Sequence, residues 1–180
     1  MSESKRLPTR LHHYAMVVRD HEPMRHLMED ILGFPLIATW AERTLLHDVG
    51  EVHEYCHAFY GLDDGAALAF FQFADPKMYE RCTTASPPEI GRFHHVALRV
   101  DHQRLDELKQ RLETAGMPAR VRDHGYCVSL YTNTDEGLYL EFAADPSNIN
   151  EIGAERQADA HAVLKRWLEG DHTPNNDIRH

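Results

Sequence analysis

The sequence predicts an α+β fold made of two copies of one βαβββ module. A strand that opens with a doubled histidine occurs twice, as LHHYAMVVRD at residues 11–20 and as FHHVALRVD at residues 93–101. Each copy runs into a helical stretch that stops at a glycine, and the two halves close with the similar phrases FADP (73–76) and FAADP (142–146). Repetition on this scale determines the architecture, because the two copies are expected to fold alike.

The elements of the first half follow from local patterns. Apolar alternation predicts a strand over 11–19. Pro23 suits the first turn of the helix that follows, whose apolar residues recur at helical spacing until Gly33 ends it. Asp63-Asp64-Gly65 is a hairpin turn signal. The other strands of this half are predicted over 34–39, 55–61 and 67–73.

The second half repeats this order and adds a terminal helix. A strand over 93–100 precedes a helix that Gly116 ends, and an apolar stripe that includes Trp167 predicts a further helix over about 153–169. The remaining strands are predicted near 119–122, 126–132 and 138–143. The expected organisation is an N-terminal tail (1–10), a first module (11–76), a linker (77–92), a second module (93–146) and a C-terminal helix and tail (147–180).

Composition excludes several classes of function. The formal net charge of −10 argues against nucleic acid as a partner, because phosphate backbones require clustered lysine and arginine. No apolar run reaches membrane-spanning length, and residues 1–10 lack the apolar core of a signal peptide. The three cysteines are widely spaced and contain no CxxC pair. They are typical of reduced thiols, so we expect a cytoplasmic protein.

Strand alternation indicates a candidate metal site. Successive side chains point to opposite faces of a strand, so bulky residues such as Met16 and Leu98 would pack on the helices and leave His13 and His95 on the opposite face. The same parity puts Glu141 of the last strand on that face. Two imidazoles and one carboxylate form the facial triad of a non-haem Fe(II) centre, which leaves positions open for substrate and O2.

A lone histidine at a strand start is more often a half-buried polar residue than a ligand. A glutamate between apolar neighbours is different, because a buried carboxylate needs a partner. The two histidines also occupy matching positions of the repeat. Together these observations favour a metal site formed by His13, His95 and Glu141.

The repeat, the element order and the ligand positions resemble the vicinal oxygen chelate superfamily over residues 11–146. This superfamily includes glyoxalase I, bleomycin-resistance proteins and type I extradiol dioxygenases. The resemblance implies paired modules that curve into a cleft around a metal ion. Alignment on the Asp-Pro ends puts Phe71 in the slot of the fourth glyoxalase I ligand, although a slip of one residue would put Gln72 there. An empty fourth slot is similar to the extradiol dioxygenases, and the closest resemblance is to their small single-domain members.

The stretch from His124 to Glu141 also resembles the extradiol signature of a histidine, an apolar-Tyr pair, a turn with glycine and the ligand glutamate. Two positions depart from it, since Asp135 replaces a proline and Arg122 a small or branched residue. The resemblance implies that His124 and Tyr131 protonate or hydrogen-bond the reacting oxygens. The acid-base histidine of two-domain relatives is replaced here by Ala66 or Ala67. His57, on the neighbouring strand, is the candidate to serve instead.

The implied function is an Fe(II)-dependent extradiol ring-cleaving dioxygenase that acts on a catechol-like aromatic substrate with O2. Mn, Ni and Zn are the alternative metals. One alternative function is a glyoxalase-like lyase or isomerase that uses Gln72 or water as its fourth ligand. Another is a non-catalytic, resistance-type protein that binds an aromatic molecule. Strand edges and the helix of Trp167 are candidate surfaces for a homodimer.

Overall fold

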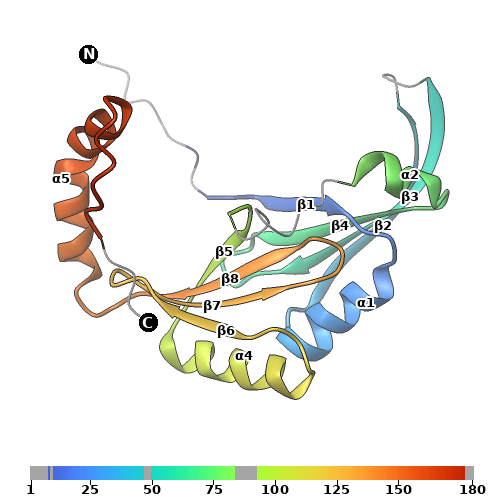
Figure 1. Cartoon of the computed structure of the whole chain (residues 1–180). Coiled ribbons are helices and arrows are strands. Elements are labelled where there is room, and N and C mark those ends of the chain that lie inside the picture. Colours follow the sequence, from blue (N-terminus) through green and yellow to red (C-terminus); the bar gives the residue numbers. More distant parts are fainter. Residues whose placement is uncertain (1–7, 9, 47–49, 84–92, 177–180) are drawn as a thin grey trace, which may run out of the picture. The chain divides into compact units, whose positions relative to one another are not determined.

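The computed structural model describes residues 8, 10–46, 50–83 and 93–176. Most of the predicted N-terminal tail, residues 84–92 of the predicted linker and residues 177–180 of the predicted C-terminal tail lie outside this description. The chain divides into two compact units, Met1–Ser86 and Pro87–His180. Figure 1 shows the elements of both units.

The first unit is a four-stranded mixed sheet with helices. Its strand order is β1-β4-β3-β2, with β1 parallel to β4 and the other neighbours antiparallel. The elements in chain order are β1 (His13–Val17), α1 (His21–Arg25), the π-helical segment η1 (His26–Leu32), β2 (Leu36–Leu46), β3 (Glu51–Gly61), β4 (Ala67–Phe73) and α2 (Lys77–Cys82).

The second unit repeats this topology. Its strand order is β5-β8-β7-β6, and β5 is parallel to β8 as β1 is to β4. The elements are β5 (Val96–Val100), α4 (His102–Thr114), β6 (Arg120–Asp123), β7 (Val128–Asn133), β8 (Tyr139–Ala144) and α5 (Ile149–Leu168). The duplicated βαβββ order confirms the predicted α+β fold.

Each core lies between its sheet and the helix that follows the first strand. Both of these helices begin at an aspartate whose side chain accepts a backbone N–H, Asp20 from Glu22 and Asp101 from Arg104. Gly33 ends η1 with a φ of 76°, a left-handed conformation that glycine adopts without strain. Buried side chains of the second core include Leu105, Leu108 and Leu112 of α4 and Leu140 and Phe142 of β8.

Three elements differ from the predicted ones. β2 and β3 form a longer hairpin than expected. Polar cross-strand pairs such as Arg43 and Glu54 stabilise its outer part, and these polar residues interrupt the apolar alternation that predicts a strand. A short helix, α2, lies in the predicted linker; its six residues are too few to show a periodicity, although Met78 and Tyr79 are buried.

The terminal helix α5 has no buried residue and stands clear of the sheet of its own unit (Figure 1). Among the described residues, no helix combines the length and apolar character that a membrane span requires.

Candidate metal centre

Strands β5 and β8 bring His95 and Glu141 together on the face of the second sheet that is turned away from α4. The parallel register pairs Ala97 with Glu141, and Leu140 and Phe142 on either side of the glutamate are buried toward the core. The imidazole Nε2 of His95 lies 2.8 Å from Oε2 of Glu141. The predicted alternation therefore holds at both positions.

Glu141 is buried, with 8% of its surface exposed, and hydroxyl groups of β7 satisfy its other oxygen. Oε1 accepts hydrogen bonds from Ser129 Oγ at 2.5 Å and from Tyr131 OH at 2.9 Å. The thiol of Cys127 lies 3.4 Å from the Ser129 hydroxyl. These two bonds give the buried carboxylate the polar partners that an apolar sheet would otherwise deny it.

Tyr131 links Glu141 to His124. The Nε2 atom of His124 lies 2.9 Å from the Tyr131 oxygen. Because the single phenolic hydrogen is donated to Glu141, the Tyr131 oxygen must accept from His124, so Nε2 of His124 carries a proton. Burial, followed by the bond to Glu141, raises the pKa of Tyr131 from 10.0 to about 12. His124 therefore donates to Tyr131, and Tyr131 donates to the carboxylate of Glu141.

The loop before β7 holds His124 in this position. The side chain of Asp123 accepts the N–H of Gly125 at 2.6 Å, and the N–H of His124 donates to the carbonyl of Cys127 at 2.9 Å. The amide of Asn176, in the C-terminal tail, donates to the carbonyl of His124 at 3.0 Å.

In the first unit, His13 lies on the sheet face turned away from the buried side chains of Met16 and Val18. Its Nδ1 atom is 2.7 Å from Nδ1 of His12, so one of these nitrogens donates to the other. Nε2 of His13 takes no part in this bond. It is therefore the nitrogen of His13 that is left for a ligand.

His57 shares that face with His13, and their ring centroids are 6.3 Å apart. The His57 ring stacks on Phe71 at 3.5 Å and lies 4.1 Å from Phe59. Burial is the main cause that lowers the pKa of His57, with a smaller contribution from nearby His13. Within the described part of the chain its buried Nε2 has no hydrogen-bond partner. A neutral imidazole in an apolar wall can accept a proton from a bound molecule.

The slot equivalent to Glu141 in the first unit is occupied by Ala69, and the alignment that put Phe71 there is wrong. β1 pairs Ala15 with Ala69, as β5 pairs Ala97 with Glu141. Alignment on the Asp-Pro ends misses this by two residues, because Asp75 follows Ala69 by six positions whereas Asp145 follows Glu141 by four. Alanine cannot bind a metal, and Ala69 is completely buried.

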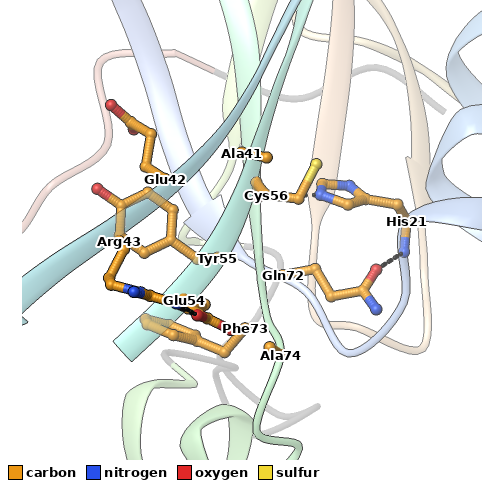
Figure 2. A pocket seen from close by; sticks show the side chains of 10 residues that line it. All are labelled: His21, Ala41, Glu42, Arg43, Glu54, Tyr55, Cys56, Gln72, Phe73 and Ala74. Carbon is orange, nitrogen blue, oxygen red and sulfur yellow. Dashed lines mark hydrogen bonds and ion pairs between the residues drawn. The ribbon is translucent and has the colours of Figure 1, made fainter. Parts of the chain in front are cut away.

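Gln72 is also excluded from this face. Its side-chain oxygen accepts the backbone N–H of His21 at the start of α1, at 2.7 Å, as Figure 2 shows. This bond turns the amide toward the helix side of the sheet, away from His13. Gln72 lines a separate groove of about 690 Å³ beside the β2–β3 hairpin. The other lining residues are His21, Ala41, Glu42, Arg43, Glu54, Tyr55, Cys56, Phe73 and Ala74.

The structure thus brings His95, Glu141, Tyr131 and His124 together in one unit and His13 with His57 in the other. Within the described ranges, no three His, Cys, Asp or Glu side chains are grouped so that they could hold a metal ion. His95 and Glu141 suit a divalent cation, because a metal ion can take the place of the proton that lies between His95 Nε2 and Glu141 Oε2. Ser129 has no role in the sequence-based site, although the polar alternation of its strand places it on the same face.

Comparisons with known proteins agree with this architecture. The chain is similar to a glyoxylase/bleomycin resistance protein/dioxygenase domain from Frankia sp. EAN1pec, with 16% identity, a TM-score of 0.60 and coverage of 78% of this chain and 100% of that one. A mutant of the fosfomycin resistance protein FosX from Listeria monocytogenes, complexed with Mn(II) and 1S,2S-dihydroxypropylphosphonic acid, matches with 13% identity, a TM-score of 0.56 and coverage of 79% and 97%. The oxidase ChaP-H2 matches with 16% identity, a TM-score of 0.52 and coverage of 78% and 96%.

These identities show a shared fold. No curated protein matches the chain significantly in sequence. A family model matches residues 10–150, most of the chain. The chain therefore belongs to the glyoxalase/bleomycin resistance protein/dioxygenase superfamily.

Proposed function

We propose that this protein is an Fe(II)-dependent dioxygenase that opens catechol-like aromatic rings with O2, with His13, His95 and Glu141 as the metal ligands. The observation that carries the proposal is the hydrogen-bonded chain from His124 through Tyr131 to Glu141. Two protonated groups would then lie beside the carboxylate that we propose as a ligand. A dioxygenase needs such groups, because protons must move as a diol binds and as its ring opens.

The absence of a fourth ligand in the described first unit supports this proposal. Ala69 occupies the equivalent slot and Gln72 is bound to α1. Three protein ligands leave more than one position open, so a diol and O2 can be held together. The bound metal ion would supply a Lewis acid for the diol and a redox-active centre for O2.

The protein groups would bind the substrate and move protons. His57, whose pKa is lowered by burial, is suited to accept a proton from a substrate hydroxyl. His124 holds a proton on Nε2 and Tyr131 stays protonated, so either group could exchange its present acceptor for a substrate oxygen that gains charge. The aromatic rings of Phe59 and Phe71 suit an aromatic guest. The reaction adds both atoms of O2 to the ring, so it needs no external reductant.

Each rival function lacks one of these supports. A lyase with Gln72 as its fourth ligand would require the loss of the bond between Gln72 and α1. A phosphonate ligand like the one in the FosX complex would favour free cationic groups, whereas Arg99 is paired with Asp145 at 2.8 Å. A binding protein that needs no metal would have no use for a buried Glu141 beside His95.

Oxygen uptake tests the proposal. Protein loaded anaerobically with Fe(II) would be mixed with a panel of substituted catechols while O2 and the yellow ring-cleaved product are followed. We expect uptake with at least one catechol, its loss in His95→Ala, and its retention in His26→Ala, which changes an exposed histidine paired with Asp30. Iron-loaded protein that consumes no O2 with any catechol would refute the proposal.

A further inference from the structure

We propose that Ser129 is a positioning residue of the metal centre, which holds Glu141 so that only Oε2 is presented beside His95 Nε2. This inference rests on the metal centre of the proposed function, but not on its substrate. Ser129 is completely buried, and its hydroxyl donates to Oε1 of Glu141.

The two oxygens of Glu141 have different surroundings. Oε1 accepts both hydroxyl bonds, from Ser129 and Tyr131, whereas Oε2 lies 2.8 Å from Nε2 of His95. Two donors on one oxygen oppose rotation of the carboxylate about its last torsion. Oε2 of the carboxylate therefore stays turned toward His95. Hydrogen bonds to ligand carboxylates commonly support metal affinity in this way.

The duplication provides an internal comparison. The register pairs Tyr131 with Glu141 and Ser129 with Ala143 in the second unit. At the corresponding places of the first unit, Phe59 pairs with Ala69 and His57 pairs with Phe71. The unit that has the carboxylate thus has two hydroxyl donors, and the unit with alanine in that slot has neither. This pattern indicates that Ser129 serves Glu141, since the strand itself folds without a hydroxyl there.

Metal titration of the full-length protein tests the proposal. The dissociation constant for Mn(II) would be measured by calorimetry, with the electron paramagnetic resonance signal of bound Mn(II) as a second readout. Ser129→Ala removes the hydroxyl with little change in volume, and Ser129→Cys keeps the size with a weaker donor. The matched control is Thr132→Val, because Thr132 is also buried on β7 and its hydroxyl has no partner among the described residues.

We expect Ser129→Ala to raise the dissociation constant by about 10- to 100-fold. Ser129→Cys should fall between Ser129→Ala and wild type, and Thr132→Val should equal wild type. Wild-type affinity in Ser129→Ala would overturn the inference, as would an equal loss in Thr132→Val, which would indicate a general packing effect. Wild-type protein that binds neither Mn(II) nor Fe(II) would overturn the metal centre as well. Weakened binding in Ser129→Ala, with no O2 uptake by the wild type, would overturn only the dioxygenase.

Discussion

A divalent metal ion should stabilise this protein against heat, and Glu141→Gln should remove that effect. A ligand that binds only the folded state adds stability that grows with its concentration relative to its dissociation constant. Glutamine keeps the size of the side chain and can still accept the bonds from Ser129 and Tyr131 at its remaining oxygen. It lacks the charge, and its amide nitrogen would take the place of Oε2 beside His95.

The expected shift follows from linkage. At a metal concentration of 100 times the dissociation constant, binding adds about 2.7 kcal/mol. For a chain of this size, each kcal/mol moves the melting temperature by roughly 2–4 °C, so the shift should be roughly 5–11 °C. In Glu141→Gln without metal, the two hydroxyl bonds persist, and we expect the melting temperature to stay within about 4 °C of wild type, the equivalent of about 1 kcal/mol.

The assay is a melting curve of the full-length protein with chelator and then with increasing Mn(II). Glu113→Gln is the matched control, because Glu113 lies on the exposed side of α4 in an ion pair with Lys109. It should show the full metal shift. A full shift in Glu141→Gln would refute the reasoning that Glu141 is a metal ligand. A shift missing in Glu113→Gln would indicate a general effect of charge.

Three other changes test neighbouring parts of the structure. Tyr131→Phe leaves His124 without its acceptor and Glu141 with one hydroxyl donor. The rate of ring cleavage should therefore fall by about 10²- to 10⁴-fold, while the melting temperature without metal changes little. An unchanged rate would exclude the tyrosine from proton transfer. Gln72→Ala removes the bond to the start of α1 and should cost about 1 kcal/mol in urea unfolding without changing the Mn(II) affinity, whereas lost affinity would restore Gln72 as a ligand. Burial raises the pKa of Cys56. At pH 7 its alkylation by iodoacetamide, followed by mass spectrometry, should therefore be several-fold slower in the folded protein than in urea. Equal rates would mean that the thiol is not shielded.

Strand parity is the reason that part of the site could be predicted. A residue's face depends only on the alternation along its own strand, so His13, His95 and Glu141 could each be assigned to the face of its own sheet that lies opposite the bulky neighbours. The hydrophobic repeat also determined the βαβββ order, because it recurs in both halves. The contact between His95 and Glu141 was a consequence of these two features.

Register could not be predicted in the same way. A shift of two residues keeps every side chain on its face, so parity cannot distinguish Ala69 from Phe71 as the counterpart of Glu141. The bond from Gln72 to His21 depends on the position of the first residue of α1 relative to β4, and the sequence pattern of β4 does not predict that position. Likewise, the bond from Ser129 to Glu141 joins diagonal neighbours on two strands, and it becomes visible only when their register is known.

The equivalent faces of the two sheets have diverged in their chemistry, and this divergence argues for catalysis over simple binding. A binding protein needs a surface that fits its guest, and the face with His57, Phe59 and Phe71 would provide one. The second face is instead committed to one buried carboxylate, and three hydrogen-bonding side chains, Ser129, Tyr131 and His95, lie within 2.9 Å of its oxygens. Such a network is costly to leave unsatisfied. The network therefore supports the proposal that Glu141 is a metal ligand, held in place by its hydrogen-bond donors for chemistry on a bound substrate.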